Sequence, residues 1–474
     1  MKLLAAFSLC LLSASSAFAA KPNILFIAVD DLRPWLGCYD PALKHSPNID
    51  KLAASGRLFT RHYVQVPTCG ASRCALLFGR RAGHFPADVS NEAIEKTAAK
   101  QPVPSLPALF RRNGYQTVAI GKITHYPGGH SGKDWQDGPE ELPGSWDECT
   151  MPCGPWKTPE AAMHGYAGGA GRAAEKEKGK PPLMQITGAD DKSCPDGWTA
   201  EAAIARLKEL AVTGGEKPFF LAVGFLKPHL PWVMPQPYTA GDLPVPPLPA
   251  VASKPDFPST WHNSAEFRQY RFIEGDPFSS TEAALKGRQA YLACVRYTDA
   301  QVGKLLDALA GSPAAANTVV VLWGDHGFLL GEHGVWGKHC LYEEALHSPL
   351  IIRVPEQAKA GAASDAIVET VDIYPTLASC AGLPLPEGLE GSSLMPQLRD
   401  PSAASDGIAI AAWQQFVTVR DDKHRLIVSK KNPEHVEFYE EASDPGERTN
   451  AAASAAEAVA RLRALIIPAV EEKE

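Results

Sequence analysis

Ionisable side chains follow four short apolar runs of the sequence, at the point where each run ends. The runs and the residues that follow them are 23–29 with Asp30 and Asp31, 117–120 with Lys122 and His125, 219–225 with Lys227 and His229, and 318–323 with Asp325 and His326. Such runs are typical of strands that are buried on both faces of a parallel sheet. Ligand sites in open α/β sheets lie just beyond the carboxyl ends of these strands. We therefore expect these side chains to meet at one sheet edge.

Two of these strand ends carry residue pairs that could bind a metal ion. Asp30 and Asp31 place two carboxylates side by side, and a divalent cation would relieve their repulsion in a buried cleft. Oxygen ligands favour calcium or magnesium over zinc. Asp325 and His326 offer further ligands from a second strand end. Each pair taken alone also has an ordinary structural explanation, such as a helix N-cap for an aspartate.

Cys69 lies where a short helix is expected to begin. The apolar residues 74–78 end at Gly79, which is typical of a helix terminus. The unpaired N–H groups of the first turn would favour an anion close to Cys69. In isolation this cysteine would be an inert thiol or half of a disulfide. Lys338 follows the glycine-rich residues 331–337 and adds a cation, although a single lysine is usually a solvated charge.

Helical patterns alternate with the four apolar runs, which predicts a doubly wound α/β domain with a mainly parallel sheet flanked by helices. The expected helices are residues 47–55, 105–113, 199–210 and 282–309. Residues 128–195 are rich in glycine, proline and charge, and residues 231–258 are rich in proline. We expect both segments to form long loops over the sheet edge, where they would shape a substrate pocket.

A smaller unit is expected after residues 383–405, which are rich in proline, glycine, serine and alanine. Short antiparallel strands are predicted at residues 408–412, 416–419 and 424–428, with a closing helix at 451–465. The chain then divides into a large domain at residues 21–395 and a C-terminal subdomain at residues 396–474.

The beginning of the chain predicts export. Lys2 supplies a positive charge, residues 3–12 are apolar, and Ala17-Phe18-Ala19 forms a small-x-small cleavage site. We expect a cleaved signal peptide at residues 1–20, no membrane anchor, and a periplasmic or extracellular location. The sequence contains no Asn-x-Ser/Thr acceptor for glycosylation, which favours a bacterial source.

The net charge limits which partners the protein could bind, and the cysteine count limits how many disulfides it could form. The net charge of −8 leaves no basic excess to neutralise phosphates, so no nucleic-acid partner is expected. Of ten cysteines, Cys10 lies in the expected signal peptide, and the nine that remain are an odd number that requires at least one unpaired thiol. A disulfide between Cys194 and either Cys149 or Cys153 is expected in an oxidising compartment.

Several motifs together resemble the type I sulfatases of the alkaline phosphatase superfamily. Cys69-x-Ala71-Ser72-Arg73 with Leu77-x-Gly79-Arg80 is similar to their signature, which is Cys or Ser, x, Pro or Ala, x, Arg, with Leu-Thr-Gly-Arg downstream. Further similar stretches, in chain order, are residues 29–34, 36–39, 46–50, 219–224, 227–229, 331–334 and 443–447. Within the family, these stretches are most similar to iduronate-2-sulfatases. Ala71 replaces the usual proline and Phe78 the usual threonine.

The resemblance implies an alkaline-phosphatase-like large domain and a nucleophile made after translation. A formylglycine-generating maturation enzyme would oxidise Cys69 to formylglycine, which hydrates to a geminal diol. The resemblance further implies a calcium ion held by Asp30, Asp31, Asp325 and His326, with the modified Cys69 as an additional ligand. One diol oxygen would attack sulfur, and the second hydroxyl would allow sulfate to be eliminated, which a serine alcohol cannot do.

The remaining site residues take roles by the same resemblance. Arg73 would hold the diol, and Lys122 and Lys338 would bind the sulfate oxygens. His229 would act as the general acid for the leaving alcohol, and His125 would take the proton of the second diol hydroxyl. The expected activity is hydrolysis of sulfate monoesters on a sugar of a glycosaminoglycan or algal polysaccharide, including a 2-O-sulfated uronic acid.

Two other functions stay open at this point. A phosphomonoester or phosphonate hydrolase of the same fold would handle a similar tetrahedral anion, although a richer set of Asp and His ligands for two metal ions would be expected there. A non-catalytic glycan-binding protein would result if Cys69 stayed unmodified. The chemical state of Cys69 therefore separates the catalytic from the binding alternative.

Overall fold

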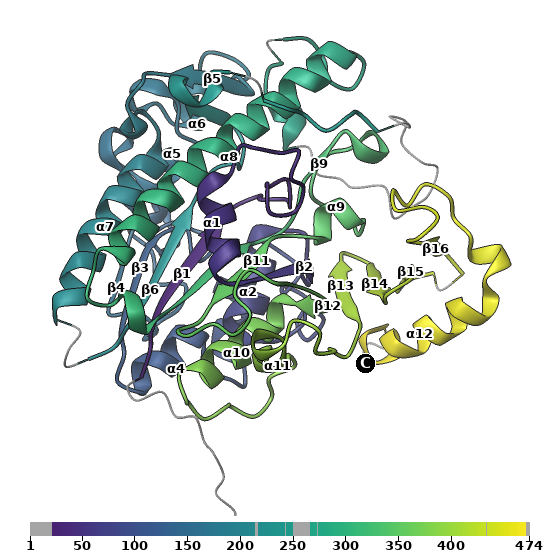
Figure 1. The fold of residues 1–474 in the computed structure, drawn as a ribbon. Helices are drawn as coiled ribbons and strands as arrows, with labels where there is room; N and C mark the ends of the chain where they lie inside the picture. Colours follow the sequence, from purple (N-terminus) through teal and green to yellow (C-terminus); the bar gives the residue numbers. More distant parts are fainter. Residues whose placement is uncertain are drawn as a thin grey trace, which may run out of the picture.

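The computed structural model describes residues 21–470 except 214–216, 242, 250–265, 273 and 433. The expected signal peptide at residues 1–20 and the last part of the expected loop at 231–258 lie outside the described residues. A large sheet crosses the centre of the molecule, and a smaller sheet with one helix lies at its side (Figure 1). No helix among the described residues is long and apolar enough to cross a membrane.

The large sheet has eight strands, of which seven run parallel to one another. They are β1 (Asn23–Val29), β2 (Arg57–Tyr63), β3 (Gln116–Gly121), β4 (Glu148–Thr150), β6 (Phe219–Phe225), β8 (Thr318–Gly324), β11 (Leu350–Arg353) and β12 (Ala363–Glu369). Their order across the sheet is β12-β2-β11-β8-β1-β6-β3-β4, and only β11 is antiparallel to its neighbours. The four strands predicted from the apolar runs are β1, β3, β6 and β8, which lie side by side in the order β8-β1-β6-β3.

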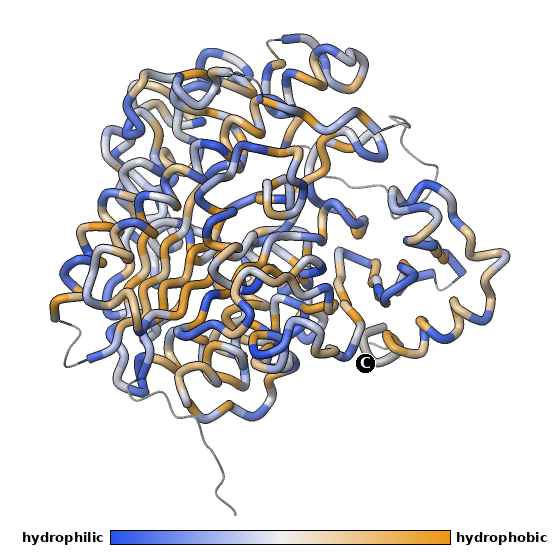
Figure 2. The backbone as a smooth tube through the Cα atoms, viewed as in Figure 1, coloured by the Kyte–Doolittle hydropathy of each residue, from blue (hydrophilic) through white to orange (hydrophobic). Residues whose placement is uncertain are grey.

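Helices cover both faces of this sheet (Figure 1). One face carries α1 (Pro47–Ser55), α7 (Pro195–Thr213) and α8 (Thr281–Ala310), and the other carries α2 (Cys69–Phe78), α4 (Leu106–Arg112), α10 (Ile373–Cys380) and α11 (Met395–Arg399). Along β1, Leu25 and Ile27 pack on the first face, whereas Ile24 and Phe26 pack on the second. Burial of each such side chain contributes about 1.5–3 kcal/mol. The central strands are accordingly apolar throughout (Figure 2).

The segment between β3 and α7 is more ordered than the sequence indicated. Short elements occur in it and in other connections: α3 (Ala93–Thr97), α5 (Pro159–Met163), α6 (Arg172–Lys176), β5 (Met184–Thr187), β7 (Trp232–Pro235), β9 (Leu329–Leu330), β10 (Trp336–Gly337) and α9 (Glu343–Leu346). The strand β4 joins the edge of the large sheet, and β5 pairs in parallel with β7. The expectation of continuous loop over residues 128–195 is therefore wrong in part, because strands of three or four residues are too short to show a hydrophobic period.

The C-terminal part forms an antiparallel sheet with a helix on one face (Figure 1). Its elements are β13 (Ala409–Trp413), β14 (Phe416–Arg420), β15 (His424–Ser429), β16 (Val436–Glu440) and α12 (Ala456–Val470). Leu462 and Ile466 of α12 pack against Val419, Leu426 and Phe438 of the sheet. Three strands and the helix were expected, and β16 was not. The expected fold class, an alkaline-phosphatase-like domain with a small antiparallel C-terminal subdomain, is confirmed.

Buried ion pairs attach this sheet to the large domain. The guanidinium of Arg425 on β15 pairs with Glu447, and it also lies 2.5 Å from Glu343 Oε2 at the start of α9. Tyr63 at the end of β2 donates its hydroxyl hydrogen to Glu343 over 2.9 Å. Burial of a charge is costly unless it is paired. Of these contacts, the pair between Arg425 and Glu343 connects the C-terminal sheet to the large domain.

The expected disulfide is absent from the described structure, and that expectation is wrong. All nine cysteines from Cys38 onward are free thiols. Cys194 packs in a small buried group with Tyr166, Val233 and Tyr297, whereas Cys149 packs against the core on the other side of the sheet. The spacing of cysteines along the chain therefore does not reflect their separation in space.

Candidate active site

Charged side chains from separate strand ends meet in one buried cluster. Lys122, directly after β3, has its ammonium 2.5 Å from a carboxylate oxygen of Asp30, directly after β1. Lys338, directly after β10, lies 2.7 Å from Oδ1 of Asp31. Nε2 of His326 lies 3.4 Å from the same Asp31 oxygen. The structure thus brings together side chains that are far apart in the sequence, as the positions of the strand ends predicted.

The backbone fixes the carboxylates relative to one another. The amide of Asp30 donates to the carbonyl of Phe225 over 3.2 Å, which ties the end of β1 to β6. Asp31 has a positive φ of 58°, and its amide donates to Oδ1 of Asp325 over 3.0 Å. The amide of Asp325 in turn donates to the carbonyl of Val29 over 3.2 Å. A non-glycine residue in this backbone region is uncommon, and it turns the Asp31 side chain into the cluster.

Cys69 is the first residue of α2 and points at the same cluster. Its sulfur lies 3.2 Å from Nζ of Lys338, 3.3 Å from Nε2 of His326 and 4.0 Å from Oδ1 of Asp31. Burial raises the pKa of the Cys69 thiol far above its usual value, and the Asp30 charge raises it further. The unmodified thiol therefore stays protonated and is a weak nucleophile.

A neighbouring asparagine holds the start of α2 in place. Oδ1 of Asn91 accepts hydrogen bonds from the Gly70 amide at 3.0 Å and from the Thr68 hydroxyl at 2.9 Å. A Cβ atom at position 70 would lie 2.0 Å from the Asn91 carbonyl oxygen, so only glycine fits there. Asn91 was not anticipated, because nothing in its sequence surroundings indicates a contact with the cysteine segment.

Arg73 lies one turn further along α2 and is engaged by carboxylates. Its guanidinium donates to Oδ2 of Asp325 at 2.9 Å and to Oδ1 of Asp30 at 3.2 Å. It also donates to the backbone carbonyls of Lys122 and Ile123. The expected contact is with the modified Cys69, whereas the observed contacts fix the position of two carboxylates.

The protonation of the carboxylates follows from their burial and their partners. Burial alone would raise the pKa of Asp30, but Lys122, His229 and Arg73 hold it well below its usual value. Burial raises the pKa of Asp31 despite Lys338, and it also raises the pKa of Asp325. The surrounding cations therefore favour the charged form of Asp30, whereas a further positive charge nearby would favour the charged forms of Asp31 and Asp325.

The cluster has the donor set of a divalent-cation site. Ligand atoms of Asp30, Asp31, Cys69 and His326 all lie within 4.8 Å of one another. Oδ2 of Asp31 is buried and has no hydrogen-bond partner, so it is free to bind a cation. Nδ1 of His326 lies 2.9 Å from the Gly327 carbonyl, which leaves Nε2 as the ligand nitrogen. Carboxylate oxygens suit calcium, and an oxygen at the Cys69 position would suit it better than sulfur.

Two histidines lie at the margin of this cluster. His229 is buried, and its Nδ1 lies 2.6 Å from the Leu230 carbonyl, which leaves Nε2 for contacts with other groups. The ring of His125 packs against Tyr126 and Trp135, at centroid distances of 5.0 and 6.4 Å. Burial lowers the pKa of both histidines well below the usual value, and Lys122 and Lys338 lower them further.

Other polar residues near the site come from loops and were not anticipated. Nε2 of His229 lies 3.6 Å from Oε1 of Glu266, and the ring of His164 lies 5.8 Å from that of His229. The ring of His339, next to Lys338, stacks on Trp413 of β13 at 4.7 Å. This last contact brings the C-terminal sheet to the border of the site, which no sequence pattern indicated.

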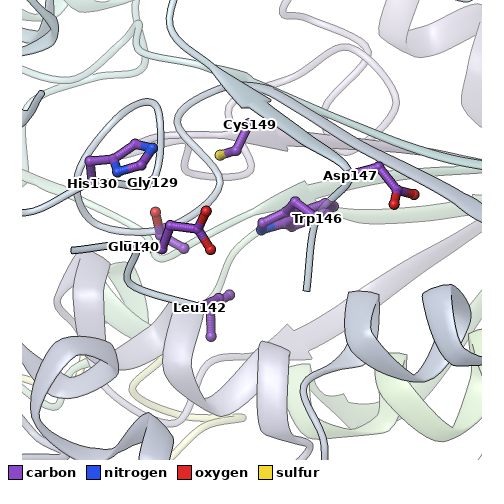
Figure 3. A pocket seen from close by; sticks show the side chains of 8 residues that line it. Gly129, His130, Glu140, Leu142, Trp146, Asp147 and Cys149 are labelled. Atoms are coloured by element: carbon purple, nitrogen blue, oxygen red, sulfur yellow. The ribbon is translucent and has the colours of Figure 1, made fainter. Parts of the chain in front are cut away.

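A separate cavity of about 80 Å³ is lined by the connection between β3 and β4 and by β4 itself (Figure 3). Its wall is formed by Thr124, Gly129, His130, Glu140, Leu142, Trp146, Asp147 and Cys149. No residue of the predicted site lines it. The predicted site residues therefore lie in the buried cluster around Cys69, apart from this cavity.

The fold is alkaline-phosphatase-like, and carboxylates, lysines and the N-terminus of α2 meet at the carboxyl edge of its sheet. The sulfatase family model matches residues 22–383, and the model of the N-sulphoglucosamine sulphohydrolase C-terminal region matches residues 331–468. The chain belongs to the sulfatase family, and its activity is that of a sulfuric ester hydrolase. The cluster residues lie between Asp30 and Lys338 in the chain, so the sulfatase match covers all of them.

Individual relatives agree with this assignment. A sulfatase of Formosa agariphila is 33% identical over 91% of this chain and 83% of its own length. The iduronate 2-sulfatase of Mus musculus is 32% identical over 81% of this chain and 73% of its own. A solved structure in complex with its substrate D-glucosamine-2-N,6-O-disulfate has a TM-score of 0.70 at 21% identity, with coverage of 94% of this chain and 97% of that one.

Proposed function

We propose that this protein hydrolyses sulfate monoesters of a sulfated saccharide, with Cys69 oxidised to formylglycine and calcium as the cofactor. The observation that carries the proposal is the position of Cys69 at the start of α2, with Lys338, His326 and Asp31 within 4.0 Å of its sulfur. A helix N-terminus and a lysine favour an anion at this point. A sulfate group placed there would have its sulfur next to the side chain of residue 69.

The lysines have the positions needed to bind a sulfate group. Lys122 reaches the cluster at Asp30, and Lys338 reaches it at Asp31. Both side chains are buried, so their charges act in a water-poor environment where electrostatic stabilisation is strong. We assign them to the sulfate oxygens, where they stabilise negative charge during transfer. Arg73 would keep Asp30 and Asp325 in place during this step.

Calcium fits between the carboxylates and the nucleophile. Asp30, Asp31 and His326 would hold it, together with an oxygen of the modified Cys69. We add Asp325 as a further ligand, because its Oδ1 lies 3.7 Å from Nε2 of His326. The bound ion would supply positive charge that lowers the pKa of a hydroxyl on its ligand. The unpaired Oδ2 of Asp31 and the raised pKa values of Asp31 and Asp325 support a cation at this point.

The two histidines supply proton transfer. His229 has only Nε2 left for contacts with other groups, and we assign it to protonate the leaving alcohol. Its pKa is low in the free protein because of burial, and the negative charge of a bound sulfate ester would raise it. The low pKa of His125 keeps its imidazole neutral, as a general base requires. We assign His125 to the proton of the second hydroxyl on residue 69.

The protonated state of the Cys69 thiol supports the proposal that Cys69 must be oxidised before the protein can act on sulfate esters. The buried thiol is protonated at neutral pH, so it would not attack sulfur efficiently. Formylglycine supplies a hydrated aldehyde with one hydroxyl to accept the sulfuryl group and another to release it. A maturation enzyme would have to recognise the segment around Cys69, with Ala71 and Phe78 at its variable positions.

The substrate is proposed from the relatives and from the expected location. Both the iduronate 2-sulfatase and the solved complex have names that point to sulfated sugars. We propose a sugar of a glycosaminoglycan or an algal polysaccharide, with a 2-O-sulfated uronic acid as the first compound to test. Export by the signal peptide at residues 1–20 would bring the enzyme to such polymers outside the cytoplasm.

Mass spectrometry and a substrate panel test this proposal together. The protein is produced with a formylglycine-generating enzyme, and the tryptic peptide that contains Cys69 is weighed. We expect loss of the thiol mass in favour of the aldehyde, release of sulfate from at least one defined saccharide, and no turnover by Cys69→Ser. A persistent thiol would overturn the formylglycine assignment. Hydrolysis of phosphonate or phosphate esters in preference to sulfate esters would support the rival hydrolase instead.

A further inference from the structure

Two histidines and one glutamate meet beside the cluster of Asp30, Asp31, Cys69 and His326. Ligand atoms of His164, His229 and Glu266 lie within 4.8 Å of one another. His164 follows α5, His229 follows β6, and Glu266 belongs to a third segment, so the three reach this point independently. His164 and His229 are buried, whereas the Glu266 side chain is 22% exposed and leaves an approach from solvent.

The spacing of these groups fits a shared ion better than a direct hydrogen bond. Nε2 of His229 lies 3.6 Å from Oε1 of Glu266, which is too long for a hydrogen bond. Two ligands each about 2.1 Å from one zinc ion, at a tetrahedral angle, are about 3.4 Å apart. The observed separation is therefore close to the one that two ligands of a single zinc-sized ion would have.

Both imidazoles have a ring nitrogen that could bind a metal ion. Nδ1 of His229 faces the Leu230 carbonyl at 2.6 Å, and a ligand histidine usually makes such a bond with its second nitrogen. Nδ1 of His164 is buried and has no hydrogen-bond partner. Burial lowers the pKa of both rings well below the usual value. Neutral imidazole is the form that binds metals, so no proton has to leave at neutral pH.

The electrostatic surroundings limit which ion could bind. Lys227, Lys122 and Arg172 act on His164, and Lys122 and Lys338 act on His229. Glu266 and Asp30 supply the nearby negative charge. A hard cation such as calcium needs six or more oxygen ligands, which this set cannot provide. Two imidazoles and one carboxylate are instead a ligand set of zinc, with a fourth position open to solvent.

We propose that His164, His229 and Glu266 form a binding site for a zinc-class divalent ion, which inhibits the enzyme reversibly. The ion occupies Nε2 of His229, the nitrogen that the proposed mechanism assigns to the leaving alcohol. Zinc therefore competes with substrate for this side of the site. The ion-binding part rests on geometry alone and holds whether or not the protein is a sulfatase, whereas inhibition rests on the proposed function.

Cobalt titration of the whole mature protein in excess calcium tests the binding part. Calcium occupies the carboxylate cluster, and cobalt replaces zinc as a coloured probe. We expect one equivalent of cobalt with the visible absorption of a tetrahedral site, which zinc displaces. Glu266→Gln removes one charge at a partly exposed position, and His164→Ala removes one ligand. Each change should weaken binding at least tenfold.

A matched control and three adverse outcomes make the test decisive. The control is His84→Ala, which removes a histidine from another pair of a histidine and a glutamate. In that pair, Nε2 of His84 lies 2.6 Å from Oε1 of Glu390, and both side chains are partly exposed. The cobalt affinity of this variant should equal that of the unaltered protein. The proposal is wrong if no cobalt binds, if Glu266→Gln binds it unchanged, or if an intense sulfur-to-cobalt band shows that cysteines are the ligands. Inhibition by zinc is then measured separately, as a rise in KM with unchanged kcat.

Discussion

The ammonium nitrogen of Lys338 lies 3.2 Å from the sulfur of Cys69. The same ammonium lies 2.7 Å from Asp31, so one buried cation serves both the nucleophile position and the proposed cation site. Proximity to both makes this lysine the most direct test of the site. It also lies outside α2, so its replacement leaves the start of that helix intact.

Replacement of Lys338 by methionine should remove most of the activity. The methionine keeps much of the side-chain volume but loses the charge that stabilises the transferred sulfate. We expect kcat to fall about 100- to 1000-fold, the usual loss for one stabilising group at a developing charge. Sulfate release is the measurement, and Lys359→Met, at an exposed lysine paired with Asp400, is the control. Near-normal kcat in Lys338→Met would exclude a role in catalysis.

Calcium should stabilise the protein through Asp31. Addition of calcium to chelator-treated protein should raise Tm, because an ion that binds only the folded state stabilises it. Asp31→Asn removes the charge next to the unpaired oxygen, so the calcium-dependent rise in Tm should largely disappear. Differential scanning calorimetry with and without calcium measures both effects. An equal rise in Asp31→Asn and the unaltered protein would place the calcium elsewhere.

The pH optimum should lie on the acidic side of neutrality. His125 must be unprotonated to act as a base, so activity falls as pH drops below its pKa. His229 must be protonated to act as an acid, so activity falls as pH rises above its pKa. Burial lowers both values well below 6.5, which places the optimum below that pH. The profile of kcat/KM against pH for a sulfated sugar tests this.

A nitrophenyl sulfate provides the internal control for that profile. Its leaving group needs no proton, so the loss of activity at high pH should be smaller than for the sugar. His229→Ala should accordingly cost the sugar substrate about 100-fold or more, and the nitrophenyl ester far less. Equal losses on both substrates would contradict the assignment of His229 as the acid.

Arg425 should be a major determinant of stability. Its replacement by alanine leaves Glu447 buried without an ion-pair partner and Glu343 with Arg420 as its arginine partner, and an uncompensated buried charge typically costs about 3–5 kcal/mol. Arg461 forms an ion pair with Asp421 at an exposed position, and Arg461→Ala should cost less than about 1 kcal/mol. Urea unfolding of the two variants gives the comparison. Similar midpoints would mean that the buried pairs do not hold the C-terminal sheet in place.

The sequence predicted the parts of the fold that have strong local patterns. The apolar runs gave β1, β3, β6 and β8, since central parallel strands must be apolar on both faces. The strand β2 was missed because its sequence, Arg-Leu-Phe-Thr-Arg-His-Tyr, mixes charged and apolar residues without a clear period. The antiparallel β11 was missed as well, because three apolar residues followed by an arginine do not distinguish a strand from a helix.

The same division applies to the site. Asp30, Lys122 and Asp325 could be predicted to meet because strand ends of a parallel sheet share one edge. His164 and Glu266 could not, because their segments carry no regular pattern and long-range packing alone brings them to His229. The disulfide expectation failed for a related reason, since the distance between Cys149 and Cys194 depends on which side of the sheet each residue packs.

The burial of Cys69 limits when the residue can be altered chemically. The side chain is 2% exposed, and the first turn of α2 is closed by Asn91 and Thr68. An enzyme that modifies this residue must reach it before the chain has folded. Folding and modification would therefore compete kinetically during biosynthesis. Molecules that fold first would be trapped in an inactive but stable form. The fraction of active protein from an expression host would then depend on the rate of modification relative to the rate of folding.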